Sequence, residues 1–293
     1  MPEPGAERPG LDERQAQLAY NHFTDGSLLF SMGDYEAAAE AFERALRYDP
    51  ASYEIRLSLA ESYFRLRQFT RAIAVAKAIV PKDAEVYDLL GRTYGYLGQN
   101  EDARTAYLDL LQYDSTDTQA YWFLSRLAMR RGNLEEATNH LSHLARYRPA
   151  SRIYNELGDL YIRMGRPDDA IATYRRSLVQ DSTEANRGAF LGLAGALEAA
   201  GRIDEAAARY RYVIAASPED LTTRRRLVHL YLSHNELDSA IAQVEEILAR
   251  EPSDADRVRL GLLLYDTEQY DRAESLFVQI AAVDGEESYL GVF

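Results

Sequence analysis

Apolar side chains alternate with polar ones in this chain at the spacing of helices, and the pattern is clearest between residues 151 and 184. One stripe occupies positions i, i+3, i+4 and i+7, the face of an amphipathic helix, and consists of Tyr154, Leu157, Gly158 and Tyr161. A second stripe consists of Ala170, Tyr174 and Ser177. Between them, Gly165 is suited to end one helix and Pro167 to begin the next. The pattern therefore predicts two helices joined by a short turn.

The same pair of stripes returns along almost the whole chain. Its most regular marker is an alanine of the second helix, which recurs after 34, 31, 34, 33, 36, 34 and 33 residues. The eight marker alanines are Ala38, Ala72, Ala103, Ala137, Ala170, Ala206, Ala240 and Ala273. A larger side chain follows four residues later in every case except Ala76, which follows Ala72. Such a period indicates a stacked array of similar helix pairs, none of which can bury its stripe alone.

This pattern resembles the tetratricopeptide repeat (TPR), a unit of 34 residues that carries W-x2-L-G-x2-Y, then A-x3-F, then P. The matching residues include the pair Leu157-Gly158, Tyr161 nine residues before Ala170, and Pro149 twelve residues after Ala137. The resemblance implies an all-α, right-handed superhelical solenoid of antiparallel helix pairs, with about eight repeats over residues 19–287. We expect the repeats to begin near residues 19, 53, 84, 118, 151, 187, 221 and 254.

Three segments depart from the repeat. Residues 1–18 hold three prolines and no apolar run, so we expect a disordered leader and not a signal peptide. Residues 288–293 resemble the start of a further helix, truncated or capping. Because the last apolar face of a solenoid needs a cover, we expect the natural chain to continue beyond Phe293 or another chain to cover this end. The second repeat is three residues short and has Arg67 where others have glycine, so its second helix should end a turn sooner.

Composition narrows the classes of function. The chain has no cysteine, which excludes disulfides, thiolate metal sites and a cysteine nucleophile within it. Its net charge of −14 disfavours binding to nucleic acid or to an anionic membrane surface. No uninterrupted apolar run reaches the length of a membrane span, so we expect no membrane insertion. We expect a cytoplasmic protein, or a periplasmic one if a signal peptide has been removed. Lys77 and Lys82 are the only lysines beside many arginines, which favours a GC-rich, bacterial genome.

Residue patterns typical of catalysis or metal binding are nearly absent from the sequence. No P-loop, serine-hydrolase or zinc-protease motif occurs. His140 and His143 stand three residues apart without a third ligand, so a solvated surface explains them better than a metal site. Close helix packing explains Gly188, Gly192 and Gly195 better than a phosphate loop does. We interpret the carboxylates as scattered over exposed faces, and we predict no catalytic residue, no cofactor and no metal.

With catalytic and metal sites set aside, the remaining candidate for a functional site is a surface on the first helix of each repeat. Positions 2, 5, 9 and 12 of that helix lie about 200° around its axis from the packing stripe, on the side that lines the concave groove of TPR arrays. Trp, Tyr, Phe, Met and Arg, the residues enriched at interaction hot spots, gather at or beside these positions. The candidate groove residues are Phe23, Phe30, Phe64, Arg92, Tyr96, Trp122, Phe123, Arg126, Arg130, Arg163, Arg225 and Arg226. In the alternative interpretation, aromatic residues such as Phe30, Phe64 and Trp122 fill gaps between adjacent first helices.

The resemblance and this surface imply a non-catalytic scaffold that binds a partner peptide or domain in the groove. The arginines favour a partner segment with acidic and large apolar residues, with Trp122 as its anchor and Arg126 and Arg130 pairing its carboxylates. The residue pattern of the clamp that binds chaperone tails is absent from all eight repeats. Two alternatives stay open: a scaffold that forms homo-oligomers through the array ends, and an accessory arm of an enzyme complex.

Overall fold

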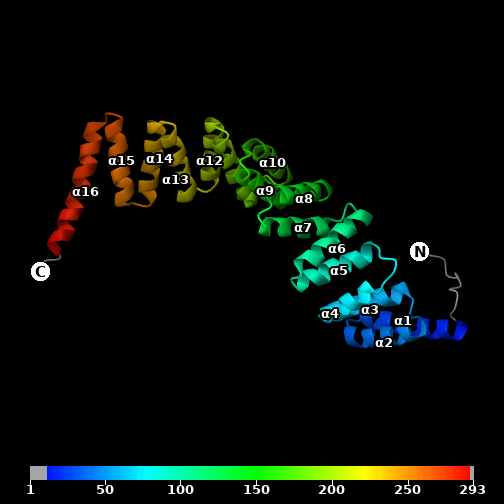
Figure 1. Cartoon of the computed structure of the whole chain (residues 1–293). Helices are drawn as coiled ribbons and strands as arrows, with labels where there is room; N and C mark the ends of the chain where they lie inside the picture. The colour runs from blue at the N-terminus through cyan, green and yellow to red at the C-terminus, as the bar shows by residue number, and fades with distance from the viewer. Residues whose placement is uncertain (1–11, 291–293) are drawn as a thin grey trace. The chain divides into compact units, whose positions relative to one another are not determined.

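The computed structural model describes residues 12–290, with side chains as far as residue 280, and within this range it contains helices and turns but no strand (Figure 1). The chain divides into two compact units, residues 1–147 and residues 148–293. The helices of the first unit are α1 (Glu13–Ser31), α2 (Tyr35–Tyr48), α3 (Tyr53–Arg65), α4 (Phe69–Lys77), α5 (Ala84–Tyr96), α6 (Asn100–Tyr113), α7 (Thr118–Arg130) and α8 (Leu134–Tyr147). Those of the second unit are α9 (Ser151–Arg163), α10 (Pro167–Gln180), the 3-10 helix η1 (Glu184–Asn186), α11 (Arg187–Ala199), α12 (Ile203–Ala216), α13 (Leu221–Ser233), α14 (Leu237–Arg250), α15 (Asp254–Asp266) and α16 (Tyr270–Leu290).

The sixteen α-helices of the described range form eight hairpins, as the repeat pattern predicts. Seven of the eight first helices begin at the expected residue, and α1 is the exception. It begins at Glu13 because the Asp12 carboxylate caps it, accepting a hydrogen bond from the backbone N–H of Gln15 at 2.6 Å. Residues 13–18 of the expected leader are therefore helical, and residues 1–11 lie outside the described residues.

The second repeat and the C-terminal helix differ from the average repeat. Helix α4 has nine residues, whereas α6 has 14, which confirms the early end expected for the short repeat. At the other end, α16 runs to Leu290 without a break. No separate helix begins at residue 288, and residues 291–293 lie outside the described residues.

Each hairpin turns at a residue with positive φ. Five of these residues are glycines, Gly33, Gly98, Gly132, Gly165 and Gly201. The other three are Arg67, Asn235 and Glu268, with φ between 58° and 60°. In each turn the next residue donates its N–H to the carbonyl five residues earlier, as from Gln99 to Tyr94 at 3.0 Å. This is the Schellman closure of a helix end, so the repeat imposes one turn geometry even where glycine is missing.

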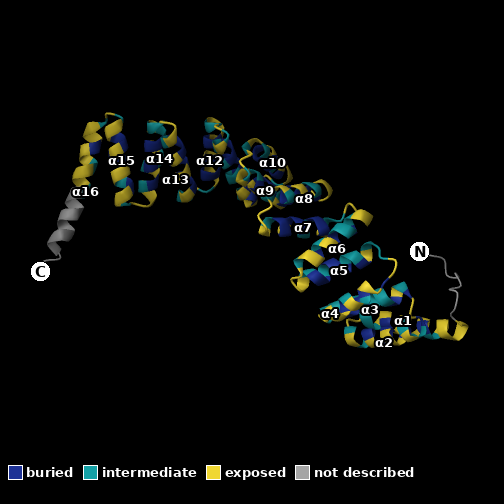
Figure 2. Cartoon of the chain, in the orientation of Figure 1, coloured by how far each residue is buried: buried dark blue, intermediate teal, exposed yellow. Residues whose placement is uncertain are grey.

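The core of each repeat lies where its two helices cross. The eight marker alanines are all buried, seven of them with no exposed surface and Ala273 with 2%. In Figure 2 the buried residues follow the inner faces of the hairpins while the outer faces are exposed. Because these alanines have almost no exposed surface, a bulkier residue there would overpack the core.

A missing side chain on the first helix makes room for a ring on the second. Four glycines face rings of their own repeat, and a Cβ on any of them would lie 2.6–2.9 Å from the nearest ring atom. The pairs are Gly26 with Phe42, Gly91 with Tyr107, Gly158 with Tyr174, and Gly261 with Phe277. In the short second repeat both positions hold alanine, Ala60 and Ala76, and both are fully buried. Glycine and ring therefore occur together in these repeats because one provides the space that the other fills.

Tyr174 joins three helices through this packing. Its ring lies against Gly158 of α9 and also against Gly192 of α11, where an added Cβ would come closer still. Its hydroxyl donates a hydrogen bond to the Asp159 carboxylate. Close helix packing thus explains Gly192 as expected, whereas an added Cβ at Gly195 would meet no atom within 4 Å.

We predict that Gly158→Ala lowers the free energy of unfolding of the full chain by about 1–3 kcal/mol, because the new methyl group pushes against the Tyr174 ring. The matched control is Gly195→Ala, a glycine of α11 with open space around it. This change should stabilise the chain by up to about 1 kcal/mol through helix propensity. Urea unfolding followed by circular dichroism measures both effects. Equal effects of the two substitutions would contradict the packing described.

Candidate partner-binding site

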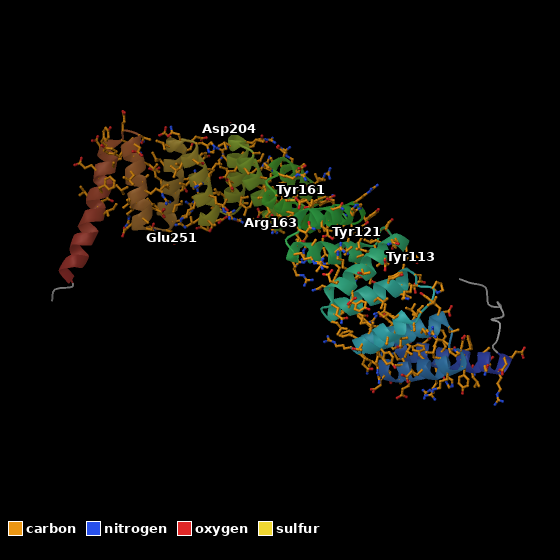
Figure 3. All side chains as sticks on the ribbon, in the orientation of Figure 1. Tyr113, Tyr121, Tyr161, Arg163, Asp204 and Glu251 are labelled. Atoms are coloured by element: carbon orange, nitrogen blue, oxygen red, sulfur yellow. The ribbon has the colours of Figure 1, made fainter. Side chains whose placement is uncertain are left out.

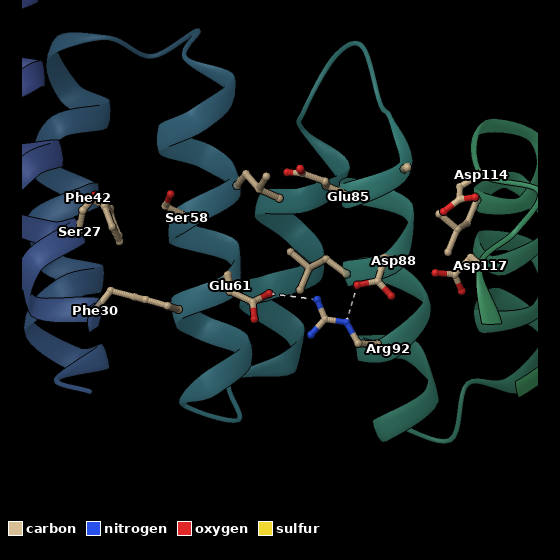
Figure 4. Close-up of a pocket in the computed structure, with 14 residues that line it drawn as sticks. Ser27, Phe30, Phe42, Ser58, Glu61, Glu85, Asp88, Arg92, Asp114 and Asp117 are labelled. Carbon is tan, nitrogen blue, oxygen red and sulfur yellow. Dashed lines mark hydrogen bonds and ion pairs between the residues drawn. The ribbon is translucent and has the colours of Figure 1, made fainter. Parts of the chain in front are cut away.

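The first unit contains a pocket of about 570 Å³ on its first helices (Figure 4). The helices that form it are α1, α3 and α5, with the loop that leads into α7 and single residues of α2 and α6. Its lining residues are Ser27, Phe30, Phe42, Leu57, Ser58, Glu61, Ala84, Glu85, Asp88, Leu89, Arg92, Leu110, Asp114 and Asp117. Three consecutive repeats and the start of a fourth thus share one hollow surface.

Arg92 is the cation of this pocket, and two carboxylates of the chain already hold it. Its Nε donates to Asp88 at 2.7 Å, and one terminal nitrogen donates to Glu61 of the preceding repeat at 3.2 Å. Burial alone would lower the pKa of Arg92, but these two carboxylates more than offset it and raise the pKa. The guanidinium also lies 4.8 Å from the centre of the Phe64 ring. Arg92 therefore joins α5 to α3, and its charge is largely neutralised before any partner arrives.

The pocket is acidic, which corrects the interpretation of the carboxylates as scattered over exposed faces. Five of its lining residues are Glu61, Glu85, Asp88, Asp114 and Asp117. Sequence reasoning could have found Glu85, because it stands at position 2 of its repeat, one of the groove positions. Asp114 and Asp117 precede α7 and lie outside those positions, so the spacing rule misses them.

Two clusters of candidate aromatic residues lie near the turn ends of the hairpins. The Phe30 ring packs edge-on against Tyr35, with centres 5.1 Å apart, and the Arg65 guanidinium lies 5.9 Å from each ring. The Phe64 ring lies 5.5 Å from Tyr96, which in turn stacks on Phe69 at 5.4 Å. Phe30 and Phe64 are half-buried against the core, whereas Tyr96 is 68% exposed. Phe30 thus lines the pocket and also packs within its own hairpin.

Phe23 and Phe123 pack within the fold. The Phe23 ring lies 5.7 Å from Phe42, and the Phe123 ring lies 4.7 Å from Tyr107 of the preceding repeat. Both are half-buried. Phe123 therefore contributes to the contact between repeats.

Trp122, Arg126 and Arg130 follow one another along α7. Trp122 is half-buried, and the Arg126 guanidinium lies 5.9 Å from its ring centre. Arg126 and Arg130 are exposed, and Arg130 donates a long hydrogen bond of 3.3 Å to the Asn100 side chain. This part of the candidate surface keeps two accessible guanidinium groups beside an indole ring.

The three remaining candidates lie in the second unit. Arg163 is exposed at the end of α9 (Figure 3), and Arg226 is exposed on α13. Arg225 forms ion pairs with Glu251 at 3.1 Å and Asp256 at 3.2 Å. Hydrogen bonds to those two carboxylates raise its pKa. Like Arg92, it links neighbouring repeats.

The prediction that both histidines lie on a solvated surface was wrong for His140. His140 is buried, and its ring centre lies 6.1 Å from that of Tyr121, while His143 stacks on the same ring at 5.1 Å. Burial lowers the pKa of His140. The spacing within its own helix does not predict this burial, because the partner ring comes from the first helix of the repeat. Within the described residues no group of three or more histidines and carboxylates could hold a metal ion, and no helix is long and apolar enough to cross a membrane.

Comparison with known families identifies the repeat. One tetratricopeptide-repeat model matches residues 23–86, 89–141 and 144–220, and a second matches residues 197–260. The chain belongs to the tetratricopeptide repeat family. TPR units are generally non-enzymatic interaction domains, and this chain is a protein-interaction scaffold.

Individual TPR relatives are distant. RNA polymerase II-associated protein 3 of Rattus norvegicus is 24% identical over 177 residues, which are 55% of this chain and 27% of that protein. The match therefore spans about a quarter of this curated relative. The C-terminal part of a TPR protein from Cytophaga hutchinsonii has a TM-score of 0.57 and 19% identity, covering 79% of this chain and 96% of that chain. YrrB, a TPR protein with an unusual peptide-binding site, has a TM-score of 0.51 and 18% identity, covering 68% of this chain and 97% of that one. These structures establish the fold alone.

We predict that a double-mutant cycle of Glu61→Gln and Arg92→Gln gives a coupling of about 1–2 kcal/mol, because both side chains are more than three-quarters buried. The matched control is Arg175→Gln with Glu205→Gln, a pair that also joins neighbouring repeats but is half exposed on both sides. Its coupling should be about 0.5 kcal/mol or less. The measurement is the free energy of unfolding in urea for each single and double variant. A coupling at Glu61 and Arg92 no larger than that of the control pair would show that the buried link is not formed.

Proposed function

We propose that the first unit of this scaffold binds a segment of a partner protein on the face of helices α1, α3, α5 and α7. The observation that carries the proposal is the pocket, since its lining comes from successive first helices and not from one hairpin. Its volume lies within the range of about 300–1,000 Å³ that is typical of ligand sites. The peptide-binding site of YrrB supports a peptide as the occupant by analogy of fold.

We further propose that α7 recognises acidic and large apolar residues of the same partner. Trp122 would contact an apolar side chain, and the exposed guanidinium groups of Arg126 and Arg130 would pair with carboxylates. In the second unit the exposed Arg163 and Arg226 offer the same chemistry. Arg92 and Arg225 do not enter this part of the proposal because each lies between two carboxylates of the chain. A non-catalytic role and a cytoplasmic location complete the proposal, and cell fractionation tests the latter.

A homo-oligomer is the second candidate. Tyr265, Tyr270 and Val278 of the last hairpin are more than half exposed and line, with Phe277, a hollow of about 530 Å³. A second copy of the chain could bury these residues. Light scattering of the full chain separates the two candidates, because the peptide-binding scaffold needs only a monomer of 33.1 kDa.

We predict that Trp122→Ala weakens the binding of peptides selected from a random phage-displayed library by about thirtyfold, as expected when a hot-spot anchor is truncated. The matched control is Tyr113→Ala, which removes a 60% exposed ring from the second helix α6 and should leave binding unchanged. Fluorescence anisotropy gives the dissociation constants, and circular dichroism confirms the helix content of both variants. Equal binding by wild type and a folded Trp122→Ala variant would place the ligand elsewhere.

A further inference from the structure

The walls of the pocket in the first unit are apolar, whereas most of its charged groups are acidic. Leu57, Ala84, Leu89 and Leu110 line it together with the ring of Phe30. The polar groups include five carboxylates and a single guanidinium, that of Arg92. An apolar recess edged by negative charge fits a side chain that has an apolar stem and a cationic end.

The charge of Arg92 does not neutralise this site. Arg92 pairs with Asp88 and Glu61, and Glu61 also accepts a hydrogen bond from Arg65 at 3.1 Å. Among the described residues, the structure gives no cationic partner to the other three carboxylates, Glu85, Asp114 and Asp117. The carboxylates that remain after internal pairing are therefore Glu85, at the start of α5, and Asp114 and Asp117, in the loop that leads into α7.

Two of these carboxylates are fixed by neutral donors. Asp117 caps α7, accepting the N–H of Ala120 at 2.6 Å. Asp114 accepts the N–H of Thr116 at 2.9 Å and its hydroxyl at 2.7 Å, and these bonds lower the pKa of Asp114. Both side chains are thus held in place by backbone geometry. A ligand would meet a preformed negative site and would not have to order it.

Asp88 has an unused acceptor at the centre of the pocket. Its Oδ2 accepts the hydrogen bond from Arg92, but its Oδ1 is buried and accepts none from the described residues. Burial raises the pKa of Asp88, and the nearby charges of Asp117 and Glu61 add to this effect against that of Arg92. Figure 4 shows the carboxylates of Glu61, Asp88 and Asp117 following one another across the pocket. A buried acceptor without a donor is unfavourable, so a donor that enters with the ligand would relieve it.

We propose that this pocket binds an arginine or lysine side chain of the partner segment, with its stem against the apolar wall and its cationic end among Asp88, Asp114 and Asp117. The inference rests on the proposed function, because it specifies which kind of partner side chain binds to the same face of the first helices. Arginine suits the site better than lysine, because its planar group donates to two carboxylates at once. The partner segment is thus basic at the pocket and acidic beside Trp122.

The test uses a positional-scanning library of hexapeptides, in which Arg, Lys, Gln, Glu, Leu or Trp is fixed at each position in turn. At one position the full chain should bind the Arg and Lys pools at least about tenfold more tightly than the Gln and Glu pools. The triple variant Glu85→Gln, Asp114→Asn and Asp117→Asn should lose this preference, since it removes the unpaired charges, leaves Arg92 with its partners and keeps a residue suited to capping α7. Glu85→Gln alone, at an exposed side chain, is the second variant and should reduce the preference part of the way.

The matched control removes three exposed carboxylates from second helices of the same unit, as Glu40→Gln, Asp102→Asn and Glu135→Gln. It changes the net charge equally and should retain the preference. Binding that depends on Trp122 without a preference for Arg or Lys would overturn this inference and leave the proposed function standing. A preference that the pocket variants abolish but Trp122→Ala does not affect would support the pocket and overturn the role of Trp122. If no pool binds, both proposals are wrong.

Discussion

The close approach of paired helices is the constraint on which this fold depends. In four repeats a ring of the second helix reaches the first helix at a glycine, as Tyr174 does at Gly158. Gly192 extends the same contact to the next repeat, so one ring holds three helices at fixed spacing. Because the inner faces are used in this way, the opposite face of each first helix is left to solvent or to a ligand.

The pocket of the first unit is a consequence of this stacking. Helices α1, α3 and α5 stand side by side because their second helices pack between and behind them, and the hollow lies across their outer faces. The residue that caps the start of α7 also lines this pocket. Asp117 caps α7 through one oxygen, and the same carboxylate adds charge to the pocket. A carboxylate that caps one helix thus also contributes to the electrostatic potential of a site formed by several repeats.

Periodicity predicted the backbone closely and the site only in part. The eight marker alanines and seven helix starts follow from spacing alone, since each repeat solves the same packing problem. Charge pairing does not follow from spacing. Arg92 pairs with Glu61, which lies 31 residues earlier in the chain, and no local rule links the two residues. The burial of His140 against Tyr121 likewise depends on a contact between two helices, which the pattern of either helix alone does not predict. Contacts between helices decide which polar groups remain available.

The proposed binding of partners to the first-helix face of the first unit can be mapped along the chain. Hydrogen–deuterium exchange of the full chain, with and without a selected peptide, is the decisive measurement, because exchange reports the opening of each helix. Bound peptide should add protection in α3, α5 and α7 and leave α4, α6 and α8 nearly unchanged. Protection confined to α4, α6 and α8, or to the helices of the second unit, would contradict it.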